Sequence, residues 1–158
     1  GASAQVLGVY EAALTELLAR ALAELGSARA FVVHGADGLD EISLSGETQV
    51  AELRDGQVTS YTIVPEDFGL RRSPLEAIAG GDAKTNAKIL RRVLKGELSP
   101  HREIVQANAA AALVAAGRAT DFLDGVRLAA QSIDSGAAQA KLDALIAFTQ
   151  ESKIENRK

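Results

Sequence analysis

Three carboxylates follow directly on an apolar stretch near the start of the chain. The segment VVHGADGLDEIS, residues 32–43, contains Asp37, Asp40 and Glu41. Mg²⁺ prefers one or two carboxylates together with waters and substrate phosphates, so this segment could hold such an ion. The calcium-binding loop D-x-[DN]-x-[DN]-G does not fit, because Leu39 stands at a ligand position. A solvated turn or a helix cap would use the same residues, and the spacing leaves both interpretations open.

The other polar candidates favour structural roles. His34 ends the apolar stretch, and a lone histidine near a core is more often hydrogen-bonded than reactive. No serine or cysteine in a suitable local context accompanies it, so nucleophilic catalysis is not supported. In GGDAKTNA, residues 80–87, glycines before a helix could cradle a phosphate, but Asp82 would occupy that helix terminus and repel an anion. We therefore predict that Asp82 caps the helix.

Two asparagines and two arginine pairs complete the polar inventory. Asn86 and Asn108 lie on or near apolar helix faces, and each is predicted to be a buried amide bonded to the backbone. The arginine pairs at residues 71–72 and 91–92 are predicted to lie in a solvated turn and on a solvated helix face.

The elements that precede the carboxylates predict where these side chains lie in the fold. Apolar residues 5–9 predict a strand, residues 11–25 a helix with one leucine-rich face, and residues 29–34 a second strand. A strand, a helix and a strand predict a parallel pair with a right-handed crossover. The carboxylates then lie just past the carboxyl end of a parallel strand, where open α/β sheets bind their ligands.

The rest of the chain predicts a hairpin followed by helices. Asp55-Gly56 at the centre of residues 48–63 is a strong hairpin signal. From residue 74 onward the pattern is helical, and an alanine-rich helix is expected over residues 104–116. The predicted fold is α/β, with a mostly parallel sheet that contains the βαβ unit and is flanked by helices, a β-hairpin, and a helical C-terminal half. We expect one domain over residues 1–150 and a polar tail over residues 151–158.

Composition narrows the class of protein. The net charge of −4 argues against a nucleic-acid surface, and no apolar run approaches the ~18 residues of a membrane span. The absence of cysteine excludes disulfides and thiolate metal sites, which fits a cytoplasmic protein. The chain also has no methionine and opens within a few residues of a strand. We therefore expect an incomplete domain, whose exposed sheet edge would pair with a missing N-terminal half or aggregate.

The motifs, taken in order, resemble a known family. The chain carries AQVLGVYEAALTELLARALAELGSARAFVVHG, DGLDEIS, PEDFGL, GGDAKTNAKIL, VLKGE, NAAAALVAAG and IDSGAA. In that order they resemble the C-terminal half of anthranilate phosphoribosyltransferase, of the tryptophan pathway, over nearly the whole chain.

The resemblance implies an enzyme that joins anthranilate to phosphoribosyl pyrophosphate and releases pyrophosphate with Mg²⁺. In that family the Asp-Glu pair at the positions of Asp40 and Glu41 binds magnesium beside the pyrophosphate, and both residues match. Asp37 has no family role and is expected to act at most through its neighbours. The family's active site lies at the hinge between a large α/β domain and a small helical domain that forms the homodimer.

Several family features are absent from this chain. The pyrophosphate-binding GTGGD loop, the KHGN segment, the arginine associated with anthranilate and the helical dimer domain are missing. We therefore expect the isolated polypeptide to have no transferase activity. Two alternatives remain open: a pyrimidine nucleoside phosphorylase-like domain, which uses phosphate without this metal pair, and a non-enzymatic α/β binding or assembly module.

Overall fold

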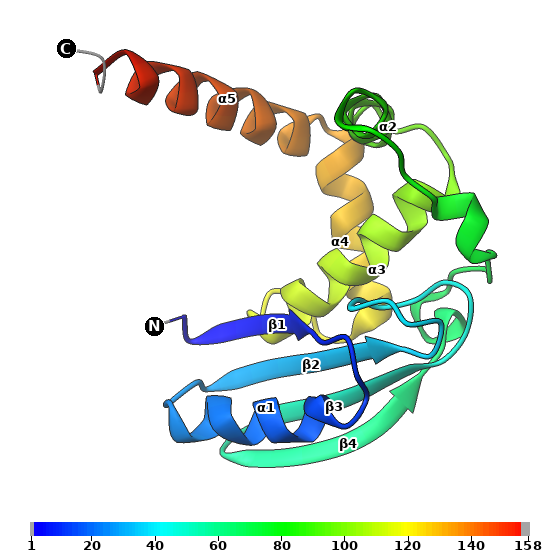
Figure 1. Ribbon diagram of the computed structural model, residues 1–158, viewed down its shortest axis with the longest axis vertical. Helices are drawn as coiled ribbons and strands as arrows, with labels where there is room; N and C mark the ends of the chain where they lie inside the picture. Colours follow the sequence, from blue (N-terminus) through cyan, green and yellow to red (C-terminus); the bar gives the residue numbers. More distant parts are fainter. Residues whose placement is uncertain (1, 156–158) are drawn as a thin grey trace.

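The computed structural model describes residues 2–155, with side chains described as far as residue 150. Its first elements form the predicted strand–helix–strand unit (Figure 1). Strands β1 (Ala4–Gly8) and β2 (Arg29–Gly35) pair in parallel, and helix α1 (Leu14–Glu24) connects them. The βαβ prediction is therefore confirmed.

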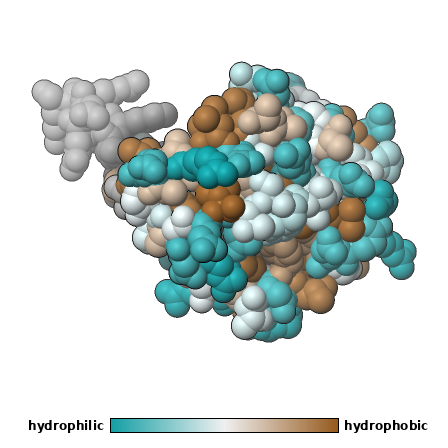
Figure 2. All heavy atoms as spheres, turned by 90° about the horizontal axis from the view of Figure 1, so that it is seen from below, coloured by the Kyte–Doolittle hydropathy of each residue, from teal (hydrophilic) through white to brown (hydrophobic). Residues whose placement is uncertain are grey.

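Helix α1 covers one face of the sheet. Its leucine-rich side packs on an apolar cluster, as the helical spacing predicts. The residues of this contact are Leu14, Leu18, Ala19 and Leu22 on α1, with Val9, Val32 and Ala51 beneath them. Figure 2 shows the molecule from below, the side on which α1 lies in Figure 1, with apolar and polar side chains interspersed.

The sheet is mixed, so the expectation of a mostly parallel sheet is wrong. Strands β3 (Thr48–Arg54) and β4 (Gln57–Ile63) form the predicted hairpin, and the sheet order in the described residues is β1-β2-β3-β4. Both β2–β3 and β3–β4 pair antiparallel. The loop between β2 and β3 contains no crossover helix, so the chain returns beside β2 in the opposite direction. At the hairpin tip, Asp55 and Gly56 have φ values of 52° and 77°, which such a turn requires.

Helices α3 (Pro100–Ala115) and α4 (Phe122–Asp134) lie over the opposite face of the sheet (Figure 1). The main core cluster joins Phe31, Val33 and Val50 of the sheet to the alanines of α3. The small side chains allow the two helices to approach closely: a β-carbon at Gly125 of α4 would lie 2.7 Å from the Ala110 β-carbon.

Two short 3₁₀ helices, η1 (Pro65–Phe68) and η2 (Leu75–Ile78), lead from the sheet to helix α2 (Ala83–Leu94). Helix α3 begins four residues before the expected start at residue 104, because Ser99 caps it and Pro100 opens its first turn.

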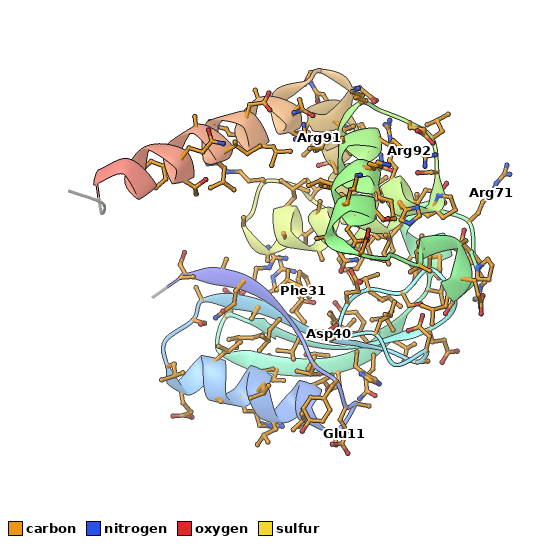
Figure 3. All side chains as sticks on the ribbon, turned by 45° about the horizontal axis from the view of Figure 1, so that its top comes forward. Glu11, Phe31, Asp40, Arg71, Arg91 and Arg92 are labelled. Atoms are coloured by element: carbon orange, nitrogen blue, oxygen red, sulfur yellow. The ribbon has the colours of Figure 1, made fainter. Side chains whose placement is uncertain are left out.

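Helix α5 (Ala137–Glu155) extends away from the rest of the described structure (Figures 1 and 3). It runs across the expected boundary at residue 150, and residues 156–158 of the expected polar tail lie outside the described residues. None of the described helices combines the length and apolarity that crossing a membrane requires.

Candidate metal centre

The acidic segment folds back on the carboxyl end of β2. The Gly38 N–H donates to the Gly35 carbonyl at 2.9 Å, and the Gly35 N–H donates to the Leu39 carbonyl at 2.8 Å. Gly38 has a φ of 91°, in the left-handed region that glycine adopts without strain. The chain therefore turns between Asp37 and Asp40, as a shared cation site would need.

Asp37 organises this loop. Its carboxylate accepts hydrogen bonds from the Ser43 hydroxyl, from the Ser45 hydroxyl at 2.6 Å and from the Leu39 N–H at 3.2 Å. Burial alone would raise the pKa of this carboxyl, but the hydrogen bonds outweigh it and the pKa is lowered. Both oxygens of the Asp37 carboxylate therefore accept hydrogen bonds from within the loop.

Asp40 and Glu41 have different surroundings. Asp40 is exposed and lies beside the segment that leaves β1 (Figure 3), whereas Glu41 is partly buried. Burial raises the pKa of Glu41, and the negative charges of Asp40 and Asp37 raise it further. A bound cation would stabilise the ionised form of Glu41 and so counteract the rise in its pKa, which means that the chemistry of this pair fits a hard divalent ion.

The pair alone does not complete a metal site. The described residues contain no group of three or more His, Cys, Asp or Glu side chains arranged to hold a metal ion. Two carboxylates suffice for Mg²⁺ only where waters or substrate phosphates supply the other ligands.

A cavity of about 300 Å³ opens beside Glu41, between η2, α2 and α3. Most of its lining side chains are apolar, among them Ile89, Val93 and Ile104. This apolar wall accounts for part of the burial of Glu41.

The backbone of the pair is held on both sides. A β-carbon at Gly8 of β1 would lie 1.5 Å from the Asp40 carbonyl oxygen, so the two backbones touch. On the other side, the Asn108 side chain of α3 accepts from the Ile42 N–H at 2.9 Å and donates to the Ile42 carbonyl at 3.2 Å. Sequence reasoning assigned Asn108 a backbone bond, which is confirmed, but did not identify Gly8.

His34 has the predicted structural contact. Its Nδ1 donates to the Val9 carbonyl at 2.8 Å, while the Val9 N–H donates to the Val33 carbonyl at 3.0 Å. These bonds join the ends of β1 and β2 beneath the acidic loop.

The glycine pair before α2 offers no free helix terminus. Asp82 accepts from the Thr85 N–H at 2.7 Å, which confirms the predicted cap. Asn86 accepts from the Gly81 N–H at 2.8 Å and donates to the Gly81 carbonyl at 3.0 Å. The predicted backbone bond of Asn86 is confirmed, but its predicted burial is wrong, because α2 lies at the surface and its first turns are exposed.

The arginine pairs lie at the outer surface, as predicted (Figure 3). Arg72 pairs with Glu66, and Arg92 pairs with Glu97. Arg102 was not identified from the sequence, although its side chain is buried, with 7% exposed. It donates to the Gly96 carbonyl at 2.8 Å and to Asp134 at 3.0 Å, and so joins the ends of α2, α3 and α4.

Comparison with known proteins supports the resemblance drawn from the motifs. Residues 1–139 match the family model described as "Glycosyl transferase family, a/b domain". Among curated proteins, the anthranilate phosphoribosyltransferase of Syntrophotalea carbinolica is 54% identical over 150 residues, which are 95% of this chain and 43% of that protein. The enzyme of that name from Anaeromyxobacter dehalogenans (strain 2CP-C) is 58% identical over 149 residues, which are 94% of this chain and 44% of that protein.

Solved structures give the same result. The crystal structure of anthranilate phosphoribosyltransferase from Thermus thermophilus superposes with a TM-score of 0.85 at 41% identity, covering 93% of this chain and 43% of that one. The enzyme from Saccharomyces cerevisiae in complex with PRPP and Mg has a TM-score of 0.80 at 31% identity, covering 89% of this chain and 41% of that one. The chain thus spans less than half the length of these relatives, in agreement with the expectation of an incomplete domain.

Proposed function

The chain belongs to the glycosyl transferase family whose a/b domain it matches, and we propose that it forms part of an anthranilate phosphoribosyltransferase. Such an enzyme transfers the phosphoribosyl group of phosphoribosyl pyrophosphate to the amine of anthranilate and releases pyrophosphate. The observation that carries this proposal is the Asp40–Glu41 pair, at the carboxyl end of a parallel strand pair, in a chain 54–58% identical to enzymes of that name.

In this proposal Asp40 and Glu41 are the magnesium ligands of the chain. The raised pKa of Glu41 supports the assignment, because burial and neighbouring carboxylates create a site that a cation would neutralise. When bound, Mg²⁺ would stabilise the negative charge that develops on the pyrophosphate leaving group. Asp37 holds the loop through Ser43 and Ser45 and makes no direct contact with the ion.

The remaining parts of the site belong to the portion of the relatives that this chain does not span. Within the described residues the proposed site consists of Asp40 and Glu41 alone. The GTGGD loop is absent from the sequence, so both substrates need further contacts. We therefore expect the 158-residue polypeptide alone to be inactive, and turnover by the pure polypeptide would contradict this.

Two exposed surfaces favour binding to a partner that corresponds to the part of the relatives which this chain does not span. Strand β1 is an edge strand, and its apolar residues are only partly buried. An apolar hollow of about 340 Å³ lies between α2, α3, α4 and α5, with Leu113 and Leu128 in its lining. An unpaired edge and an apolar hollow favour pairing with further sheet and helix layers. The assembled enzyme is expected to be a homodimer.

The test uses an enzyme of the relatives' full length that contains this chain, called the full-length enzyme below. Asp40→Asn and Glu41→Gln remove one charge each at nearly constant volume. We expect each to raise the Mg²⁺ concentration for half-maximal turnover at least tenfold. The matched control is Asp55→Asn at the hairpin tip, a position whose φ of 52° asparagine tolerates.

The outcomes separate the proposal from its alternatives. A magnesium dependence in both variants equal to that of the control would show that the pair does not bind the ion. An inactive full-length enzyme that also fails to bind phosphoribosyl pyrophosphate with Mg²⁺ would favour a non-enzymatic module.

A further inference from the structure

We propose that Asn108 is a positioning residue for the magnesium-binding pair: its amide holds the Ile42 peptide groups and thereby fixes the backbone of Asp40 and Glu41. The proposal rests on the metal role of that pair argued above. Asn108 lies on α3, 66 residues from Ile42 in sequence, and nothing in the local pattern of the acidic loop requires it.

The contacts of Asn108 are directed at one residue. Two of its three hydrogen bonds go to the N–H and the carbonyl of Ile42, and the third goes to the Ile104 carbonyl one helical turn earlier. The third bond orients the amide on α3. The other two fix both peptide planes that flank Ile42, so the amide acts as a clamp on that residue.

Ile42 follows directly on Glu41, which makes the clamp relevant to the metal ligands. The Ile42 side chain is 1% exposed and belongs to the same core cluster as Ala107 and Ala111 of α3. Core packing fixes where Ile42 lies, and the bond from Asn108 to the Ile42 N–H fixes the orientation of the peptide between Glu41 and Ile42.

The opposite side of the pair is blocked by β1. The Asp40 carbonyl touches the backbone of Gly8, as shown by the 1.5 Å separation that a β-carbon there would have. The dipeptide therefore lies between β1 and α3, with close backbone contact on one side and a bidentate amide on the other. Loss of the amide removes the hydrogen bonds on the α3 side, so we expect the pair to shift away from Gly8.

A positioning role predicts weaker metal binding with an intact fold. Partners that orient metal ligands from behind are typically worth about 10–100-fold in metal affinity. In the full-length enzyme with phosphoribosyl pyrophosphate, we expect Asn108→Ala to weaken Mg²⁺ binding about 10–100-fold, measured by calorimetry. Turnover should recover at saturating Mg²⁺. Without metal, amide hydrogen exchange at Ile42 should accelerate while exchange in β2 and β3 stays unchanged.

A second variant covers the case in which Asn108→Ala does not fold. In Asn108→Ser the hydroxyl can still donate to the Ile104 carbonyl four residues earlier, so the helix-side bond remains and only the clamp on Ile42 is lost. We expect the same weakening of Mg²⁺ binding as in Asn108→Ala.

The matched control is Gln139→Ala. Gln139 is an amide on α5 that donates to Asp143 at 2.9 Å, and it does not line the cavity beside Glu41. Its Mg²⁺ affinity should stay within twofold of the unaltered enzyme.

The outcomes distinguish this proposal from the one on which it rests. If Asp40→Asn and Glu41→Gln weaken Mg²⁺ binding while both folded Asn108 variants match the control, the positioning role is wrong and the metal role stands. If none of the four variants changes Mg²⁺ binding, both proposals fail. Activity that falls without recovery at saturating Mg²⁺ would also overturn the positioning role, because a general loss of folded enzyme explains it.

Discussion

Replacement of Gly8 by alanine tests whether the acidic loop depends on close contact with β1. Gly8 is paired with Val33 in the parallel ladder, and its φ lies outside the left-handed region, so alanine can adopt the same backbone. The substitution is therefore a steric perturbation and carries no backbone strain. The added methyl group meets the Asp40 carbonyl oxygen at 1.5 Å.

The size of the displacement follows from that distance. Non-bonded carbon and oxygen atoms come no closer than about 3 Å, so one of the two backbones must move by about 1.5 Å. The loop will move, because Gly8 is held by the sheet while Asp40 lies in irregular structure. Metal sites tolerate ligand errors of only about 0.2 Å. We therefore expect a loss of about 10–100-fold in Mg²⁺ affinity, equal to about 1.4–2.8 kcal/mol.

The assay is calorimetric Mg²⁺ binding to the full-length enzyme in the presence of phosphoribosyl pyrophosphate. Gly46→Ala is the matched control, because a β-carbon at Gly46 meets no atom within 4 Å and its φ is not left-handed. Both substitutions add one methyl group, so the difference in Mg²⁺ affinity between them isolates the steric effect on the acidic loop. Equal Mg²⁺ affinities in the two variants would refute the reasoning.

Three further predictions concern stability, each measured by urea unfolding of the full-length enzyme. Asp37→Asn should destabilise by about 1–3 kcal/mol at neutral pH, since hydrogen bonds to charged groups are worth about 1.5–3 kcal/mol each but partial exposure reduces them. Because folding lowers the pKa of Asp37, the difference in unfolding free energy should be fully present above pH 3.8, the ordinary pKa of the group. It should disappear as the pH falls through the lower pKa of the folded state, and a pH-independent difference would contradict this. Arg102→Ala should destabilise by about 2–4 kcal/mol, because the buried guanidinium bonds both Gly96 and Asp134, and Arg102→Lys should not restore the loss. Gly125→Ala should destabilise by about 1–2 kcal/mol, since overpacking against Ala110 outweighs the gain in helix propensity; a stabilised variant would show that α3 and α4 separate easily.

Features set by local residues could be predicted from the sequence. Asp55-Gly56 gave the hairpin because positive φ values are needed at that tip, and Asp82 gave the start of α2 because its carboxylate reaches the Thr85 N–H. The start of α3 was missed although Ser99-Pro100 carries its signal, because the alanine-rich stretch that follows dominated the pattern.

Features set by long-range packing could not be predicted. A glycine inside a strand indicates close approach of another backbone, but Gly8 does not reveal that the other backbone is Asp40. Arg102 looks like a surface residue in sequence, and only the convergence of α2, α3 and α4 buries it.

The acidic segment shows how packing separates residues that the sequence makes equivalent. Asp37, Asp40 and Glu41 are identical in charge, and spacing alone did not choose between a turn and a cation site. The fold surrounds Asp37 with donors, and their hydrogen bonds lower its pKa and tie it to the loop. Glu41 has a raised pKa from burial and like charge, and Asp40 beside it is exposed. Opposite pKa shifts thus distinguish Asp37, which builds the loop, from Glu41, one of the two residues proposed to bind magnesium.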